Sequence, residues 1–479
     1  MHADNSNIRN KAKRSLILAG GGMRLAYQAG VLIALEEENM TFDHVDGTSG
    51  GIFNAAMLAS GLHGHAIADR WRKLNIKHFM SLRPLKKYFR PLNMMGYADA
   101  DGIRNHVFPD LGIDIKKINA YTEADITFNV CNFSDKSIEA IDHKHVEEDH
   151  LIAGVSLPIV MPGINIGEKW YSDAVWIKDA NLMEAVRRGA EELWLVWAIG
   201  NTETYLPGAL NQYVHMIEMS ANGGLLEEYA RIDMINARIG QGISDFGQKK
   251  PIRLYVIKPE YPLPLDPDLY LNKIDARSLI NMGYAQAKKS LKSMPKGGVP
   301  MDVKATKMTD PGTRLNIRGE YHGTVVNEQE IHKAAYYTYM VFSERSDRHV
   351  LHTFSSIRLD GFSEEIPCYD HKVKITKLNN STRMECQSTF NIGNVTYSLR
   401  AEWHLGSPLD YLLGLEFKAV LLTISTEGNS APLFSGRLYQ EIKHRLKSAY
   451  TTNIRRQDGT SGGIGLKYRM TSKLFAYAV

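Results

Sequence analysis

Short apolar runs alternate with stretches of helical spacing from Ser15 to about Leu291, and this pattern constrains the fold more than any other feature. Apolar runs bounded by turn residues are typical of buried strands. Strands that alternate with helices form a mostly parallel sheet flanked by helices. We therefore expect an α/β domain, with strands near 16–19, 44–47, 126–131, 193–199 and 254–257 and helices near 27–37, 52–59 and 276–291.

The pattern changes after a segment rich in Pro, Gly and charge, residues 293–314. Beyond it, β-branched and aromatic residues cluster between turn signals, which favours strands. A chain of 479 residues has room for two or three domains. We predict a polar N-terminal tail (1–14), an α/β domain (15–292), a linker (293–314) and an all-β C-terminal domain that is a sandwich or a barrel (315–479).

Composition narrows the class of protein. The formal net charge of +4 permits contact with an anionic membrane surface but does not indicate nucleic-acid binding. The three cysteines, Cys131, Cys368 and Cys386, fit neither a disulfide framework nor zinc-ligand spacing. Because the first apolar run is too short for a signal sequence or a membrane span, we expect a cytoplasmic protein, membrane-associated at most peripherally.

Gly47-Thr48-Ser49-Gly50-Gly51 has the G-x-S-x-G pattern of a nucleophile elbow. A serine on a sharp turn between strand and helix needs neighbours without side chains, because the backbone there is strained and crowded. Residues 458–464 repeat residues 46–52 letter for letter. Only the first copy follows an apolar run and precedes a helical pattern, so we predict Ser49 as the nucleophile and place Ser461 in a flexible hairpin loop without a helix after it.

Gly20-Gly21-Gly22-Met23-Arg24 directly follows the first expected strand and opens a helix. Consecutive glycines expose backbone N–H groups to an anion, and the helix dipole adds positive potential. A phosphate-binding loop uses the same physics, but this one lacks the lysine and Ser/Thr of such loops. Paired with a nucleophile elbow, it is better explained as an oxyanion hole formed by Gly20, Gly21, Gly22 and Met23.

A G-G-G-x-R loop after one strand and G-x-S-x-G after the next resemble the patatin-like phospholipases. This resemblance covers residues 15 to about 291 and implies hydrolysis of fatty acyl esters of phospholipids or other lipids, of the phospholipase A or lysophospholipase type, without metal or cofactor. It also implies that Arg24 fixes the glycine loop, and that the base is an aspartate in a D-G-[GA] turn, without histidine. Asp173, in Trp170-Tyr171-Ser172-Asp173-Ala174-Val175, stands at the matching position.

An aspartate can accept the hydroxyl proton if burial raises its basicity. Seventeen histidines are present, but none lies in a context that marks a catalytic base; His44 fits a role in the core or at a sheet edge. The sequence departs from the family's pattern at Ala174, where glycine is usual and a positive φ would be strained, and at residues 177–182, which replace an N-x-P stretch.

The sequence is also compatible with several other functions. The same fold can serve as a catalytically weak lipid-binding or scaffold protein, and an acyl-enzyme can pass its acyl group to another alcohol, as an acyltransferase does. Residues 71–97 mix cations with aromatic and aliphatic side chains, which fits either contact with an anionic bilayer or a helical pair with a buried apolar side. The C-terminal domain could bind membrane or an activator, or drive oligomerisation.

Overall fold

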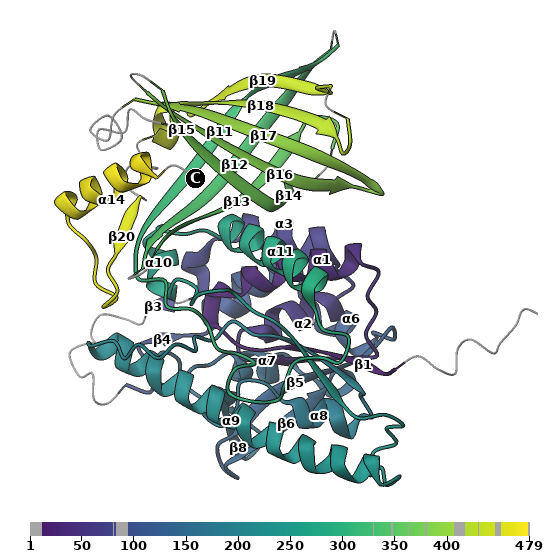
Figure 1. Cartoon of the computed structure of the whole chain (residues 1–479). Helices are drawn as coiled ribbons and strands as arrows, with labels where there is room; N and C mark the ends of the chain where they lie inside the picture. Colours follow the sequence, from purple (N-terminus) through teal and green to yellow (C-terminus); the bar gives the residue numbers. More distant parts are fainter. Residues whose placement is uncertain are drawn as a thin grey trace, which may run out of the picture.

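The computed structural model describes residues 12–79, 81–82, 94–328, 330–345, 348–362, 364–378, 381–406, 417–429, 431–445 and 452–477. Helices flank a central sheet in the N-terminal part of the chain, and a strongly curved antiparallel sheet forms the C-terminal part (Figure 1). The expected combination of an α/β region followed by an all-β region is confirmed.

The N-terminal sheet has eight strands, and five consecutive ones, counted from one edge, are parallel. In sheet order its strands are β10 (Arg253–Ile257), β9 (Glu192–Val196), β1 (Arg14–Leu18), β2 (His44–Thr48), β5 (Asp125–Asn132), β8 (Lys169–Asp173) and β7 (Ile164–Ile166), with β6 (Ser137–Asp142) also paired to β5. Side chains alternate across a strand, so Leu16 and Leu18 enter the core on one face and Ile17 the core on the other. All five expected strands are present.

Helices cover both faces of this sheet (Figure 1). The larger core contains α1 (Ala26–Glu37), α2 (Gly51–Ala59), α3 (Gly64–Lys73) and α11 (Ala276–Ser293). The opposite face packs against α8 (Leu182–Arg187) and α9 (Ala209–Gly240). We did not predict α9, because its apolar residues are interrupted by many polar and small ones; only a few side chains, such as Leu225 and Ile232, reach the core.

The pairing along β5 brings the ends of two other strands together. Thr48 at the end of β2 pairs with Asn129, and Asp173 at the end of β8 pairs with Val130, the next residue of β5. Strand β6 already occupies the other edge of β5 over these residues. Strands β2 and β8 therefore share one edge of β5, end to end, and their last residues meet.

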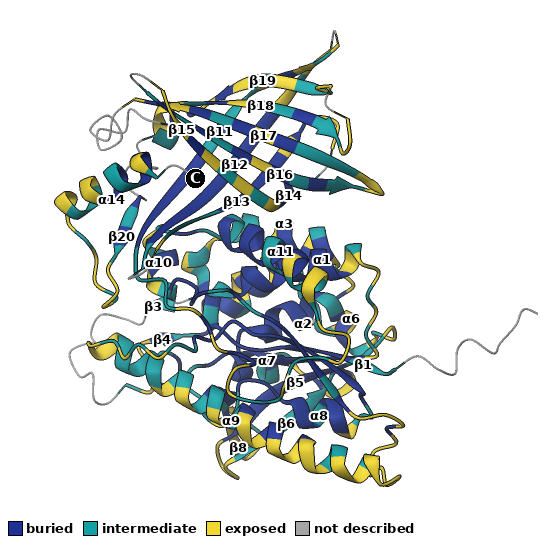
Figure 2. Ribbon diagram, viewed as in Figure 1, coloured by how far each residue is buried: buried dark blue, intermediate teal, exposed yellow. Residues whose placement is uncertain are grey.

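The C-terminal sheet is one antiparallel, barrel-like layer rather than a two-sheet sandwich. In sheet order its strands are β14 (Ile366–Pro367), β13 (His349–Leu359), β12 (Glu330–Glu344), β11 (Thr313–Asn327), β19 (Phe434–Tyr439), β18 (Ala419–Thr426), β17 (Val395–Leu405), β16 (Thr382–Ile392) and β15 (Tyr369–Lys377), with β20 (Asn453–Arg455) paired to β11. The Cys368 N–H, next to β15, donates to the Ser355 carbonyl of β13 at 2.8 Å, which nearly closes the layer. Large side chains such as Trp403 and Phe390 fill the interior. Figure 2 shows buried residues along the strands of this sheet.

One expectation for this region is wrong. The stretch after the second G-T-S-G-G copy forms a helix, α14 (Ile464–Ala476), whereas we expected a loop. Met470, Leu474 and Phe475 bury one side of this helix against the C-terminal sheet. Tertiary packing thus stabilises a helix whose sequence carries weak local signals.

The two regions pack directly on each other. The amide of Asn281 on α11 donates to the Ser356 hydroxyl of β13 at 3.0 Å, and Arg277 on α11 lies 2.9 Å from the Glu365 carboxylate. Residues 294–312 connect α11 to β11, and a bridge from Val299 to Leu254 ties this segment to the N-terminal sheet. The exact division into tail, domains and linker stays a prediction.

Among the helices that the structure describes, none combines the length and the apolar composition needed to cross a bilayer. The 71–97 segment is only partly described, since residues 80 and 83–93 lie outside the described ranges. Within the described part, Trp71 and Phe79 stack on each other in the core at a centroid distance of 6.2 Å. These two aromatic rings are therefore not available to a membrane.

Candidate active site

Ser49 lies at the turn between β2 and α2 with a φ of 51°, in the left-handed region that residues with side chains seldom adopt. The three glycines of the motif make this turn sterically feasible. A Cβ at Gly51 would overlap the Leu18 carbonyl oxygen, and a Cβ at Gly50 would lie 2.5 Å from the Gly22 oxygen. Gly47 allows α2 to pack closely, because its Cβ would approach Ala55 to 2.9 Å. The backbone has the strained form of a nucleophile elbow.

The hydroxyl of Ser49 donates a hydrogen bond to the Asp173 carboxylate, with 2.6 Å between Oγ and Oδ2. The other carboxylate oxygen, Oδ1, accepts from the Val175 N–H at 2.9 Å. The shared edge of β5 brings these two side chains together although they are 124 positions apart in the chain. A serine with its proton already directed at a base is a candidate nucleophile.

Burial raises the pKa of Asp173 to about 7, because its side chain is removed from water. The hydrogen bonds from Ser49 and from the Val175 N–H favour the ionised form and oppose this rise. A carboxyl that titrates near neutral pH can accept a proton and later return it. The environment of Asp173 therefore suits a general base.

The departure at Ala174 causes no strain. Asp173 has a φ of −56° and begins a short 3₁₀ turn, η7 (Ala174–Trp176), and Ala174 is not among the residues with positive φ. We expected a strained backbone if this position kept the geometry that glycine permits. The turn takes another conformation, in which an alanine side chain fits the core.

A buried polar network under the elbow was not predicted from the sequence. The carboxylate of Asp46 accepts hydrogen bonds from the Thr127 hydroxyl and the Asn129 amide, both at 2.6 Å. Asn129 also donates to the Gly47 carbonyl, and its own amide oxygen accepts from Asn181 at 2.8 Å. The network joins β2, β5 and the residues after Asp173, so it fixes the relative position of the two strand ends.

His44 belongs to this buried layer and not to the reaction site. Its ring bonds to the Ser15 hydroxyl at 2.7 Å and the Thr127 hydroxyl at 2.8 Å. Burial lowers the pKa of His44 to about 3, so the ring stays neutral. The expected role in the core is what the structure shows.

The glycine loop lies beside Ser49. Gly21 and Gly22 have φ values of 154° and 63°, which glycine tolerates best, and Arg24 donates to the Gly21 carbonyl at 2.8 Å, which braces the loop. The Gly20 N–H donates to the Asp179 carbonyl at 3.4 Å, and the Met23 N–H to an Asp266 carboxylate oxygen at 3.2 Å.

Three backbone donors beside Ser49 remain available to a ligand. Within the described part of the chain, no acceptor bonds the N–H groups of Gly21, Gly22 and Gly50. All three residues line the cavity next to Ser49.

Two further acidic residues adjoin the site, and we did not predict either of them from the sequence. Asp266 comes from α10 (Asp266–Tyr270), far along the chain, and lies 3.9 Å from Arg24. Asp179 is fully buried against Gly20, and neither carboxylate oxygen has a hydrogen-bond partner among the described residues. Burial, followed by the nearby charge of Asp173, raises the pKa of Asp179 well above its usual value. Burial of Asp179 therefore favours its protonated, neutral form.

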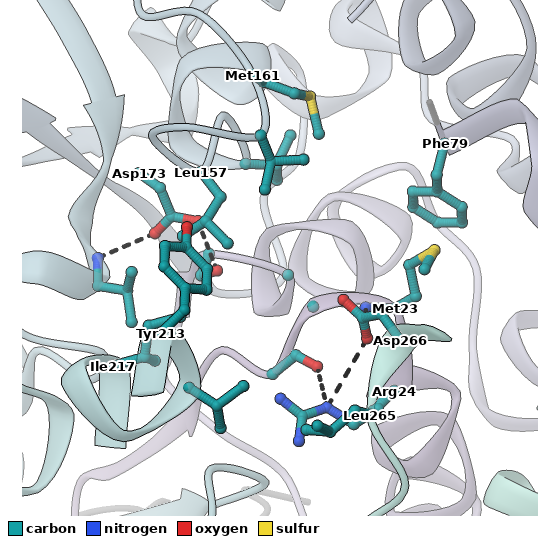
Figure 3. Close-up of a pocket in the computed structure, with 18 of the residues that line it drawn as sticks. Met23, Arg24, Phe79, Leu157, Met161, Asp173, Tyr213, Ile217, Leu265 and Asp266 are labelled. Atoms are coloured by element: carbon teal, nitrogen blue, oxygen red, sulfur yellow. Dashed lines mark hydrogen bonds and ion pairs between the residues drawn. The ribbon is translucent and has the colours of Figure 1, made fainter. Parts of the chain in front are cut away.

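An apolar cavity of about 280 Å³ opens over the two catalytic candidates (Figure 3). Asp173 and Tyr213 lie on one wall and Arg24 and Asp266 on another, while Phe79 and Met161 extend the apolar lining. Ile159 lies between Leu157 and Val160, which line the cavity. Its φ of 76° is unfavourable for a β-branched residue, and its side chain is 56% exposed. The cavity can enclose an aliphatic chain beside the serine.

The structure separates Ser461 from this chemistry. Ser461 pairs with Arg455 through an isolated β-bridge, between β20 and α14 in the C-terminal part of the chain. In the described ranges, one group of metal-ligand side chains comes together, Glu320, His322 and His444. The Glu320 carboxylate lies 3.1 Å from one imidazole and 3.0 Å from the other, so the group's own ion pairs account for its proximity.

Comparison with known proteins agrees with this geometry for the N-terminal region. The sequence model of the family described as patatin-like phospholipase matches residues 16–186, the stretch that holds the glycine loop, Ser49 and Asp173. The crystal structure of VipD from Legionella pneumophila is similar over 59% of this chain and 67% of that chain, at 11% identity and a TM-score of 0.35, a likeness too weak to support an argument. No curated protein matches the chain. Over residues 16–186, in its N-terminal part, the sequence of this chain is therefore that of a patatin-like phospholipase domain.

Proposed function

We propose that the chain hydrolyses carboxylic esters of lipids, with Ser49 as nucleophile and Asp173 as general base. The observation that supports this proposal best is the 2.6 Å hydrogen bond from the Ser49 hydroxyl to a buried carboxylate, at the base of an apolar cavity. An apolar cavity with a few convergent polar groups is the usual form of a site for a lipid-like substrate. A phospholipase A or lysophospholipase is the activity that fits the family and this cavity.

In the proposed mechanism, Ser49 Oγ attacks the ester carbonyl carbon while its proton passes to Asp173. The carbonyl oxygen becomes an oxyanion, which the N–H groups of the glycine loop (Gly20 to Met23) and of Gly50 stabilise. The N–H groups of Gly21, Gly22 and Gly50 are the donors free for this role, because no described acceptor engages them. Arg24 keeps the loop in shape through the Gly21 carbonyl.

Collapse of this intermediate breaks the bond to the leaving alcohol, which takes the proton from Asp173 and leaves an acyl group on Ser49. A water molecule then attacks the acyl carbonyl and gives its proton to Asp173. Release of the fatty acid returns that proton to Ser49 Oγ, so the enzyme ends as it began. Transfer to another alcohol in place of water would make the same site an acyltransferase.

Peripheral contact with lipid aggregates forms part of this proposal. Several apolar side chains around the cavity are exposed: Tyr97 by 52%, Ile159 by 56% and Leu210 by 50%. The Tyr97 N–H donates to the Ile159 carbonyl, so two of them are adjacent. A lipid must leave its aggregate to reach Ser49, and an apolar rim lowers the free energy of that transfer.

The decisive experiment combines covalent labelling with turnover. The full chain is incubated with a fluorophosphonate probe and the labelled serine is identified; hydrolysis of a p-nitrophenyl butyrate ester is then measured for wild type, Ser49→Ala, Asp173→Asn and Ser461→Ala. We expect labelling at Ser49, loss of turnover in the first two variants and normal turnover in Ser461→Ala, the matched control from the identical motif. Full activity of Ser49→Ala contradicts the proposal.

A further inference from the structure

A second cavity, of about 90 Å³, lies where the N-terminal and C-terminal regions meet. Its lining comes from α9, from residues 262–265, from the start of β11 and from the loop after β20. Val214 and Leu265 line both this cavity and the catalytic cavity, so the two are neighbours separated by these side chains. In Figure 1, β20 and α10 lie side by side at this junction, and Arg455 on β20 lies 2.9 Å from the Asp268 carboxylate on α10.

Arg314 on β11 lies in the wall of this cavity without a direct partner for its charge. Its side chain is only 7% exposed, and within the described residues no acceptor bonds its guanidinium and no carboxylate forms an ion pair with it; the charge of Asp268 acts on it without direct contact. The nearest aromatic group is the Tyr261 ring, 5.9 Å away. Burying a charge without a direct partner destabilises the folded protein, and a bound anion would offset this penalty for Arg314.

A second arginine adds positive charge beside Arg314. Arg455 pairs directly across the β11–β20 ladder with Arg314, and like charges opposite each other destabilise a strand pair. Burial, and next the charge of Arg455, lower the pKa of Arg314. Arg456, the next residue, also lines the cavity and donates to the Thr460 hydroxyl at 3.3 Å.

The acidic side chains around the cavity are already engaged by other groups. Asp310 accepts from the Thr204 hydroxyl and from the Gly312 N–H. Glu218 lies 2.9 Å from His215 Nδ1, and Asp268 pairs with Arg455. These contacts leave the Arg314 guanidinium without a direct hydrogen bond or ion pair among the described residues, although the charge of Asp268 acts on it from nearby.

We propose that this cavity binds a phosphate group, with Arg314 as its principal ligand and Arg455 and Arg456 beside it. Guanidinium groups present paired N–H donors that match phosphate oxygens, and a cluster of them is selective for phosphate over a single carboxylate. Because the cavity adjoins the catalytic one, the phosphate is that of the substrate headgroup, and this assignment rests on the proposed lipid hydrolysis. A free phosphate monoester has the same chemistry and is the alternative source.

Binding is tested first, independently of catalysis. The full chain carrying Ser49→Ala is titrated with inorganic phosphate and with dihexanoylphosphatidylcholine below its micellar concentration, and calorimetry measures the affinity. The same titrations are made after adding Arg314→Gln or, as a matched control, Arg437→Gln, which removes an exposed arginine from β19. We expect Arg314→Gln to weaken binding by about tenfold or more, since it removes a charged hydrogen-bond donor, and Arg437→Gln to leave binding unchanged.

Thermal unfolding shows whether Arg314→Gln simply misfolds. We expect this variant to be at least as stable as its parent without phosphate, because a buried unpaired charge has been removed, and to gain less stability when phosphate is added. A parent that neither binds nor is stabilised by phosphate or the phospholipid overturns the proposal, as does equal binding by Arg314→Gln.

Turnover by the active enzyme then separates the two sources of phosphate. For a headgroup site, Arg314→Gln lowers the ratio of kcat/KM for dihexanoylphosphatidylcholine to kcat/KM for dihexanoylglycerol, which has no phosphate. For a free phosphate site, inorganic phosphate changes the rates for both esters and Arg314→Gln abolishes that effect. If no ester is hydrolysed, the proposed function fails, while the titrations of the Ser49→Ala chain still decide whether the cavity binds phosphate.

Discussion

Replacing Asp173 with Asn is expected to abolish turnover and at the same time to stabilise the protein above neutral pH. The pKa of Asp173 is raised from 3.8 to about 7 in the folded chain. An acid with a raised pKa binds its proton more tightly in the folded state, so its ionisation opposes folding as pH rises. This unfavourable contribution begins near the unfolded-state pKa of 3.8 and is complete above the folded-state pKa of about 7.

The magnitude follows from the size of the displacement. A pKa raised by about three units lowers the free energy of unfolding by about 4 kcal/mol at pH 8. At pH 5, where the folded-state carboxyl keeps its proton, the loss is about 2 kcal/mol. Asparagine has the shape of the protonated acid and carries no charge at any pH. The stability of Asp173→Asn relative to wild type should therefore increase by about 2–3 kcal/mol between pH 5 and pH 8, or roughly 5–10 °C in Tm for a domain of this size.

Thermal unfolding of wild type, Asp173→Asn and Ser49→Ala between pH 5 and pH 8 measures this effect. Ser49→Ala is the control, because it also stops turnover but keeps the carboxyl. For the active enzyme, kcat/KM on a short-chain ester should fall about tenfold per pH unit below pH 7, as the base becomes protonated. A stability difference that is equal at both pH values, or a flat rate profile from pH 5 to pH 8, would refute the reasoning.

Three other substitutions test the surroundings of the dyad. Gly51→Ala should lower Tm strongly, because its Cβ would overlap the Leu18 carbonyl oxygen, whereas Gly465→Ala, with open space around it, should not; equal Tm values contradict this steric argument. Asp179→Asn should retain most of the turnover at pH 7 to 8, because burial raises the pKa of Asp179 and favours the neutral acid, which the amide resembles; near-complete loss of turnover would show that the ionised form is needed. Asp266→Asn keeps an acceptor for the loop and removes a negative charge beside the developing oxyanion, so kcat should rise; a fall in kcat would show that the charge is needed.

Local features of the site were predictable from the sequence alone. Apolar runs and glycines within a few residues of each other predict the strand before Gly20, the turn at Ser49 and the helices that follow. All of these elements are present in the structure. The choice of Ser49 over Ser461 came from the same local context. This choice stays a prediction; α14 does form after Ser461, but Ser461 lies in the C-terminal region and is not among the residues that line the catalytic cavity.

Only the tertiary structure decided the features that join distant segments. Ser49 and Asp173 meet because β2 and β8 end against consecutive residues of β5, a pairing that no local pattern specifies. Asp266 reaches the glycine loop from a distant part of the N-terminal region, and Arg314 faces Arg455 across a strand pair of the C-terminal sheet. The physical reason is that periodicity and turn chemistry act over a few residues, whereas burial, raised pKa values and unpaired charges depend on which surfaces the whole fold brings together.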